Sequence, residues 1–290
     1  MNDATLRLLT GEARLTIARR GAEAIAWSVG GVDLLWPGDA AIWGQVSPIL
    51  YPVVGWTRDG ARVGGRRYPL GLHGFAFAEN FAIETARGDF ARLTLRDSEK
   101  TRALYPFAFA LAVEYRLNGA ALEITIEVAN PGDAPAPYAC GLHPGFRWPF
   151  AGGPRGGAFV QFEKEEPPLV PTIAPGGLIS RETRELPLQD KVLSLDDGLF
   201  SKDALCFLEP ASRSLRFEQA DGSAIGMDFA GFGRAALWTR PDAPFLCLEA
   251  WTGYSDPEGF DADLFQKPGM LVLSPGEKAR HKAIYAYFAA

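Results

Sequence analysis

The sequence has few of the residues from which local metal and redox motifs are built. Its 290 residues include three cysteines, Cys140, Cys206 and Cys247, and this odd, scattered set argues against a disulfide framework. No Cys pair, His-x-His or HExxH spacing is present. The chain also lacks a phosphate-binding loop, a dinucleotide-binding glycine motif and a Gly-x-Ser-x-Gly element. We therefore expect no metal and no organic cofactor.

An excess of positive charge is also missing. Lysine and arginine number 29 against 35 aspartates and glutamates, which gives a net charge of −6. Nucleic-acid binding needs a basic stripe, so no nucleic-acid partner is expected. No stretch approaches the roughly 20 apolar residues of a membrane helix, and residues 1–17 lack the apolar run of a signal peptide. We expect a cytoplasmic protein without a membrane partner; the sequence carries no signal for an oligomeric state.

Sustained helical periodicity is absent, whereas short segments that alternate between apolar and polar residues are frequent. In Leu122–Val128, aliphatic residues alternate with Glu and Thr, as in a strand with one face in a core. Turn signals and 32 glycines separate such segments. The other predicted strands are Ala13–Ala18, Asp33–Trp36, Ala91–Leu95, Ala110–Tyr115, Ser214–Glu218, Ala235–Thr239 and Lys282–Phe288. Without a linker or repeat, this pattern predicts one all-β domain, residues 1–290, folded as a large antiparallel β-sandwich.

Histidine is scarce, which makes the setting of each copy informative. His73 lies in the segment LHGFA (72–76) and His143 in GLHPGF (141–146), each beside glycine and close to phenylalanine. A histidine in such a setting is either a turn residue satisfied by backbone carbonyls or a proton-transfer group. His281 lies in the charged stretch 277–282, where we expect it to be solvated.

Two acidic residues border apolar runs. Glu249 ends the apolar stretch 245–248 and is followed by Ala250 and Trp251. A buried carboxylate is costly unless it is hydrogen-bonded or paired, but burial is also how a general base reaches a pKa near neutrality. The residues alone leave both interpretations open. Asp203 precedes another apolar run, where it could equally cap the start of a strand.

Four segments, taken in order, resemble those of the galactose-mutarotase-like aldose 1-epimerases. SPILYPVVG (47–55) with LHGFA is similar to the opening of the family's sugar site, and CGLHPGF (140–146) is similar to its second histidine motif. FSKDAL (200–205) and FLCLEAWTG (245–253) are similar to its acidic strands. The resemblance extends over almost the whole chain and is closest to the LacX-like branch.

The resemblance implies a sugar partner, an aldohexose, in an open cleft of a large β-sandwich. It implies that Glu249 is the base that takes the anomeric hydroxyl proton, and that His143 is the acid that protonates the ring oxygen. His73 would assist at the ring oxygen or bind a hydroxyl, and Asp203 would hold sugar hydroxyls. No cofactor is needed, because the sugar ring opens and recloses by proton transfer alone.

Aromatic residues near these motifs could contact the apolar face of a sugar ring. Trp56, Phe146 and Trp251 are candidates, although core packing is the simpler interpretation for any one of them. Trp56 stands where many relatives carry an arginine, and Arg58 is two positions further along the chain. Arg58 is therefore a candidate for the hydroxyl contact that this arginine makes in relatives.

Three alternatives remain open at the level of sequence. A hexose-6-phosphate 1-epimerase would need several cations near the cleft, for which the candidates are Arg58, Arg62, Arg66, Arg67 and Arg147. A non-catalytic carbohydrate-binding protein could keep the same cleft, and a metal-dependent hydrolase or isomerase could use the same His and acidic residues.

Overall fold

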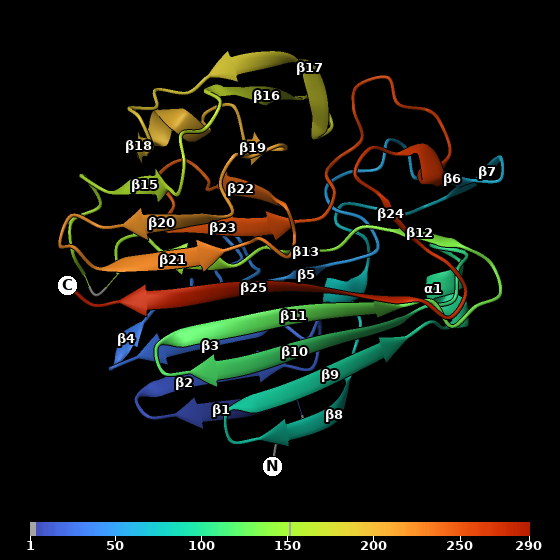
Figure 1. The fold of residues 1–290 in the computed structure, drawn as a ribbon, viewed down its shortest axis with the longest axis horizontal. Helices are drawn as coiled ribbons and strands as arrows, with labels where there is room; N and C mark the ends of the chain where they lie inside the picture. Colours follow the sequence, from blue (N-terminus) through green and yellow to red (C-terminus); the bar gives the residue numbers. More distant parts are fainter. Residues whose placement is uncertain (1–3, 151) are drawn as a thin grey trace.

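The computed structural model describes residues 4–150 and 152–290, so residues 1–3 and 151 of the expected 1–290 domain lie outside the described part. The secondary structure is almost entirely β (Figure 1). Within the described ranges the helical segments are short: α1 (Glu99–Arg102) and the 3-10 helices Ala76–Ala78, Asp197–Phe200 and Leu264–Gln266. The same ranges contain no helix long and apolar enough to span a bilayer.

The strands of the described residues form three main antiparallel sheets, which we name the large sheet, the site sheet and the N-terminal sheet. The large sheet has nine strands in the order β18 (Val192–Ser194), β15 (Phe159–Phe162), β20 (Ser214–Glu218), β21 (Ala224–Asp228), β25 (Lys278–Phe288), β11 (Ala121–Ala129), β10 (Ala110–Asn118), β9 (Phe90–Arg96) and β8 (Ala82–Arg87). The N-terminal sheet comprises β1 (Thr5–Thr10), β2 (Ala13–Ala18), β3 (Ala24–Val29) and β4 (Val32–Asp33).

The site sheet is assembled from segments that are far apart in the chain. It comprises β19 (Leu205–Phe207), β22 (Arg234–Trp238), β23 (Phe245–Trp251), β13 (Gly141–Leu142) and β5 (Ile49–Leu50), with β14 (Gly145–Arg147) also paired to β23. Three further pairs are β12 (Ala136–Tyr138) with β24 (Leu271–Leu273), β16 (Leu169–Ala174) with β17 (Leu178–Glu185), and β6 (Ala61–Val63) with β7 (Arg66–Tyr68).

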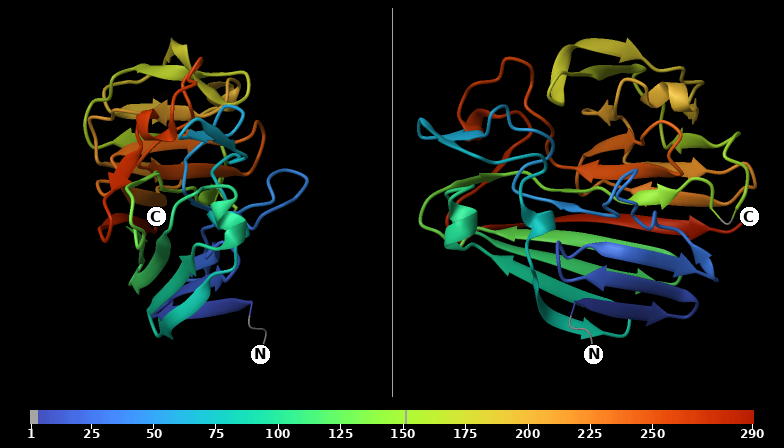
Figure 2. Two further views of the ribbon diagram at one scale, coloured as in Figure 1. Left: turned by 90° about the vertical axis from the view of Figure 1, so that its right-hand side faces the viewer. Right: turned by 180° about the vertical axis from the view of Figure 1, so that it is seen from behind.

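The large sheet packs face to face against the other two main sheets (Figures 1 and 2). Two buried tyrosine hydroxyls of the large sheet connect the layers: Tyr115 on β10 donates to the Ala22 carbonyl at 2.6 Å, and Tyr285 on β25 donates to the Leu248 carbonyl at 3.1 Å. One hydrophobic cluster includes residues from Leu6 to Tyr285. The expected all-β antiparallel sandwich is therefore confirmed.

Most predicted strands are present, and the alternation works as expected. Leu122, Ile124, Ile126 and Val128 on β11 are all buried in the sandwich. The strand predicted at 33–36 is not formed beyond Asp33, where β4 ends. The chain turns away there because Leu35 bridges to Phe146 and the Trp36 N–H donates to the Gly145 carbonyl at 2.8 Å. These contacts connect the N-terminal sheet to the site sheet.

The expectation that His281 is solvated is wrong. His281 lies on β25, where period-two alternation turns Arg280 and Lys282 outward and His281 inward. Its Nε2 lies 2.8 Å from the Tyr138 hydroxyl, and its Nδ1 lies 3.0 Å from the Gly231 carbonyl oxygen. The prediction relied on the charged residues next to His281 in sequence. On a half-buried strand, however, neighbouring residues face opposite sides, so charged neighbours do not imply an exposed side chain.

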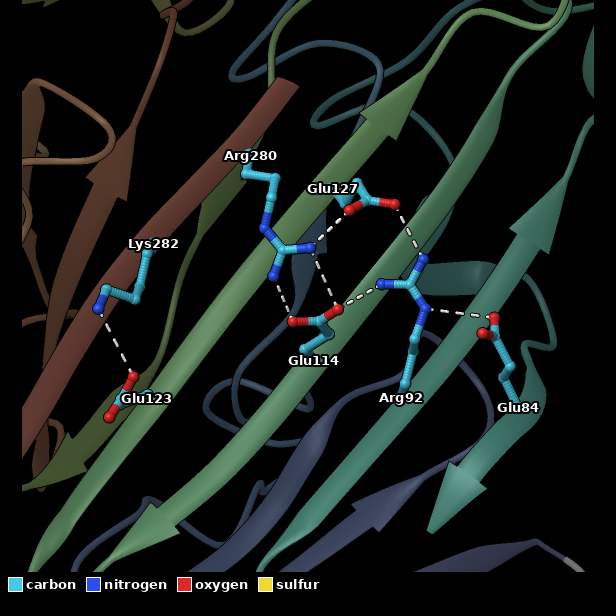
Figure 3. A network of polar contacts seen from close by, with 7 residues as sticks. All are labelled: Glu84, Arg92, Glu114, Glu123, Glu127, Arg280 and Lys282. Carbon is cyan, nitrogen blue, oxygen red and sulfur yellow. Dashed lines mark hydrogen bonds and ion pairs between the residues drawn. The ribbon is translucent and has the colours of Figure 1, made fainter. Parts of the chain in front are cut away.

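The outer face of the large sheet carries a network of paired charges, which we call the charge ladder (Figure 3). Arg92 on β9 contacts Glu84, Glu114 and Glu127, and Arg280 on β25 contacts Glu114 and Glu127. Adjacent strands place these side chains next to one another on the solvent side. Burial raises the pKa of Glu127, but hydrogen bonds from Arg92 and Arg280 outweigh it, so the pKa lies below its ordinary value.

Candidate active site

A cavity of about 390 Å³ opens over the site sheet and is covered in part by the β16–β17 hairpin, which contributes Ile173 and Ile179. A volume of this size suits one small molecule. Six of the eight residues predicted from sequence line it: His73, His143, Glu249, Asp203, Trp56 and Trp251. The fold thus brings together segments that are up to about 200 positions apart in the chain.

Strand pairing places His143 opposite Glu249. Strands β13 and β14 both pair with β23, in the registers Leu142↔Ala250 and Gly145↔Cys247. The two residues between these strands therefore lie across from Glu249, and the Pro144 carbonyl accepts from the Leu248 N–H at 3.1 Å. The result is an Nε2–Oε2 distance of 3.4 Å between the His143 imidazole and the Glu249 carboxyl group.

Burial controls the protonation of this pair. Every residue of β23 is buried, and burial raises the pKa of Glu249 well above its ordinary value, although the Trp251 indole N–H donates to Oε2 at 3.0 Å. Burial and the neighbouring His73 lower the pKa of His143 well below its ordinary value. Both directions favour uncharged groups, so the pair holds a single proton, most stably on Glu249, across a wide pH range.

His73 is held in one orientation and one tautomer. Its Nδ1 accepts from the Gly55 N–H at 3.0 Å, so in neutral His73 the proton is on Nε2. Burial lowers its pKa to about 4, so the ring is neutral at neutral pH. The backbone adopts φ = +59°, a left-handed conformation that costs a non-glycine residue about 1–3 kcal/mol. Its ring lies 5.4 Å from that of His143, nearly perpendicular to it.

The glycine after His73 is required by close packing. Gly74 has φ = +74°, and a Cβ atom there would lie 2.2 Å from the Tyr51 carbonyl oxygen. The His73 carbonyl accepts from the Tyr51 N–H at 3.2 Å, and the His73 N–H donates to the Gly55 carbonyl at 2.9 Å. The strained turn is therefore fixed between two neighbouring segments, as expected where a side chain must be aimed accurately.

Aromatic rings form much of the cavity wall. Trp43 stacks on His143 with ring centroids 5.1 Å apart, and Trp238 meets the same imidazole edge-on at 5.6 Å. Trp56 is 40% exposed at the rim and packs so closely on Gly177 that a Cβ there would lie 2.2 Å from the indole. Indole faces of this kind fit the C–H face of a sugar ring.

The loop that carries Trp56 is fastened by a buried ion pair. The Trp56 N–H donates to the Ser255 hydroxyl at 2.9 Å, and the Trp56 carbonyl accepts from the Asp256 N–H at 2.9 Å. The Asp256 carboxylate also accepts from the Arg58 N–H at 2.7 Å and from the buried Lys267 ammonium at 2.5 Å. These contacts fix the segment whose Gly55 N–H orients His73.

Two predicted site residues do not line the cavity. Arg58 is exposed and takes part in this loop through its backbone. Phe146 is 1% exposed and packs in the sandwich core on Trp27 and Tyr285. On β14, side chains of successive residues point to opposite faces, which turns Phe146 away from the cavity.

Five polar or aromatic residues that line the cavity are not predicted from the sequence: Trp43, Gln45, Trp238, Arg240 and Ser255. Trp43 and Gln45 are in an irregular segment without a motif. Trp238 ends β22 and lies within the strand predicted at 235–239, and Arg240 directly follows that strand, so an aromatic near the strand end and a cation after it were the available signal. Among the residues that the structure describes, no group of three or more His, Cys, Asp or Glu is placed to hold a metal ion.

The arrangement suits proton transfer at two neighbouring oxygen atoms. Glu249 and His143 are close enough to contact adjacent atoms of one ligand, and together they carry one mobile proton. Asp203 has φ = +70°, and its carboxylate accepts from the Ala204 N–H at 2.8 Å, which leaves further acceptor capacity for a ligand.

Comparison with known proteins shows the family of the chain and the fold that it shares. The family model described as aldose 1-epimerase matches residues 5–286. The chromosomal protein LacX of Lactococcus lactis subsp. lactis is 31% identical over 257 residues, covering 84% of this chain and 86% of LacX. A galactose mutarotase-like protein from Lactobacillus casei superposes with a TM-score of 0.90 at 24% identity, over 98% of this chain and 100% of that one.

A second solved structure, of a galactose mutarotase related enzyme from Lactobacillus acidophilus, gives a TM-score of 0.89 at 26% identity and covers 98% of this chain and 97% of that one. The family match, at residues 5–286, spans the positions of both histidine segments. The chain belongs to the aldose 1-epimerase family.

Proposed function

We propose that the protein is an aldose 1-epimerase (mutarotase) that interconverts the α and β anomers of a free aldohexose. The observation that carries the proposal is the buried pair of His143 and Glu249, 3.4 Å apart in a cavity of about 390 Å³ walled by aromatic rings. Family membership supports an epimerase role in general. The assignment of residues and substrate is our inference from the geometry.

Ring opening uses the pair with one proton. The Glu249 carboxylate takes the proton of the C1 hydroxyl, the C1–O1 bond becomes a carbonyl, and the C1–O5 bond breaks as His143 gives its proton to O5. The open-chain aldehyde rotates about C1–C2. On reclosure, protonated Glu249 returns a proton to O1 while neutral His143 accepts one from O5. Acid and base thus exchange duties, and no proton is gained or lost overall.

The protonation state that burial favours for Glu249 and His143 is one of the two states that this cycle uses. Protonated Glu249 with neutral His143, which burial favours in the free protein, is the state that ring opening produces and ring closure consumes. The state needed for ring opening requires the proton on His143, and a sugar hydroxyl that donates to Glu249 favours it by stabilising the carboxylate. One proton shared across 3.4 Å therefore supports both directions.

The remaining cavity residues have binding roles in this proposal. Neutral His73, with Nδ1 occupied by Gly55, offers its Nε2–H as a hydrogen-bond donor to the ring oxygen or a hydroxyl. Asp203 accepts from sugar hydroxyls, and Trp56 and Trp251 contact the ring. The arginines considered as phosphate ligands, at positions 58, 62, 66, 67 and 147, do not line the cavity. Arg240 does line it, but a phosphate subsite would need several converging cations, which favours a free rather than a phosphorylated hexose.

The proposal includes the cytoplasmic location expected from the sequence. Cys140, Cys206 and Cys247 are buried free thiols, and burial raises the pKa of each. Unpaired buried cysteines are compatible with a reducing compartment.

The test is direct. Freshly dissolved α-glucose and α-galactose should approach anomeric equilibrium faster with the protein than without it, as followed by polarimetry or NMR, in the presence of EDTA and without added nucleotide. If the wild-type protein accelerates no sugar, a binding protein on the same fold becomes the better explanation. If EDTA abolishes activity and a divalent cation restores it, the metal-dependent alternative is correct.

A further inference from the structure

A second depression continues directly from the catalytic cavity. This groove, of about 620 Å³, shares Ile173, Asp203, Trp238 and Arg240 with the cavity, whereas His143 and Glu249 line the cavity only. The groove adds its own charged residues, chiefly Glu182 on β17 and Lys202 before β19. A ligand whose reacting end is at Glu249 can therefore extend past Asp203 into the groove.

The charged side chains of the groove make few hydrogen bonds or ion pairs within the described part of the protein. In the described part of the chain, Glu182, Lys202 and Arg240 form no ion pair and no side-chain hydrogen bond, and the Asp203 carboxylate accepts only the adjacent Ala204 N–H. On the charge ladder, by contrast, carboxylates and guanidinium groups satisfy one another. The groove thus presents donors and acceptors that are available to a ligand.

The mixture of positively and negatively charged side chains in the groove indicates which kind of ligand it can bind. Two cations and two carboxylates line the groove together with the indole of Trp238. A phosphate group there would meet two carboxylates of its own sign, which is unfavourable. Sugar hydroxyls both donate and accept, so they fit carboxylates and cations alike, and the C–H face of a sugar ring fits an indole.

We propose that the groove is a second sugar subsite, so that the preferred substrates are reducing di- or oligosaccharides. The reducing-end residue occupies the cavity, where its C1–O5 bond opens and recloses, and the next residue occupies the groove. The glycosidic bond between them stays intact. This inference rests on the proposed mutarotase function and adds its substrate class.

The experiment compares kcat/KM for anomeric equilibration of glucose and galactose with that of maltose, cellobiose, lactose and glucose 6-phosphate. For at least one disaccharide we expect a value about tenfold above that of the monosaccharide at its reducing end, as two or three added hydrogen bonds would give. Lys202→Ala and Glu182→Ala should remove this gain and leave the monosaccharide values unchanged.

Matched controls are available in the chain. Glu185 is exposed on the same strand as Glu182 but does not line the groove, and Lys278 is exposed at the start of β25. Glu185→Ala and Lys278→Ala should keep the disaccharide gain, and circular dichroism should show that all four variants are folded.

Each remaining outcome overturns the inference in a recognisable way. Monosaccharides accelerated at least as well as every disaccharide, or a gain that persists in both groove variants, would show that the groove binds no second sugar. A selective gain for glucose 6-phosphate that is lost in Lys202→Ala would show an anion subsite instead. Absence of activity on every sugar would overturn the mutarotase function together with the subsite.

Discussion

Glutamates on two sheets of the same sandwich have opposite electrostatic settings. Glu127, in the charge ladder of the large sheet, contacts two guanidinium groups, and its pKa lies below the ordinary value. Glu249, on the site sheet, has an imidazole and an indole N–H as partners, and its pKa lies well above the ordinary value. The side chains are 13% and 2% exposed, so both are shielded from water.

The nature of the partner therefore decides the difference. A fixed positive charge keeps Glu127 ionised, whereas Glu249 faces groups that need not be charged and so can take up and release a proton. A carboxylate with permanent cations can only stabilise the fold. Substitutions at each site test whether Glu249 transfers protons while Glu127 only stabilises the fold. The site where the larger effect is expected comes first.

The largest effect is expected from removing the proton carriers. Glu249→Gln keeps the size and hydrogen bonding of the side chain but cannot accept a proton, and His143→Asn removes the imidazole. Each should lower the mutarotation rate by about 10²–10⁴-fold, the usual contribution of one positioned acid or base. Because both act in the same step, the double variant should be much less impaired than the product of the single effects.

The control for this experiment must come from another residue type, because His281 is buried against Tyr138 and its replacement would disturb the core. Glu165→Gln, at an exposed position without an ion pair in the described structure, should leave the rate unchanged. A correctly folded Glu249→Gln protein with near-normal mutarotation would show that Glu249 is not the base.

The fold could be predicted because period-two alternation reports directly which face of a strand is buried. The predicted strands at 13–18 and 214–218 coincide with β2 and β20, and the alternating residues of β11 point as expected. The same alternation holds at residues 278–282, where the charges of Arg280 and Lys282 conceal the inward orientation of His281. Alternation was the better guide there than local charge.

The site was predictable only where a motif marks it. Segments that contain His73, His143 and Glu249 were recognisable, and the structure places all three in one cavity. Trp43 and Gln45 carry no local pattern, because their positions depend on how an irregular segment meets the site sheet. Phe146 is a candidate for ring contact in the sequence, with core packing as the simpler interpretation, and the structure places it in the core on Tyr285. Three residues along the chain from His143 are enough to reverse the direction of a side chain.

The pH dependence of activity should reveal the single shared proton. Below neutrality the pair gains a second proton as the pH falls through the lowered pKa of His143, and at high pH it loses its last proton through the raised pKa of Glu249. We expect kcat/KM to form a plateau with an acid limb that begins below 6.5, the ordinary pKa of histidine. The two apparent pKa values belong to the pair, not to either residue.

The fall of kcat/KM at high pH, which reflects ionisation of Glu249, should disappear in Glu249→Gln. The residual activity of this variant is then limited by His143 alone. An acid limb centred above the ordinary histidine pKa would mean that His143 is held as the cation in the free protein, and the comparison with the charge ladder would fail.

The smallest effect is expected at the charge ladder, and only on stability. Glu127→Gln should leave mutarotation unchanged and lower the free energy of unfolding at neutral pH by about 1 kcal/mol, since such pairs contribute modestly. Because the folded pKa of Glu127 is lowered, its contribution is present above the ordinary value of 4.5 and is lost as the pH falls through the lowered value. Urea unfolding should therefore show the wild-type advantage shrinking in acid and in about 1 M salt.

Glu123→Gln, whose Lys282 partner is 3.6 Å away, should lower the free energy of unfolding by less than Glu127→Gln does. An advantage independent of pH and salt would assign the role of Glu127 to packing instead of charge.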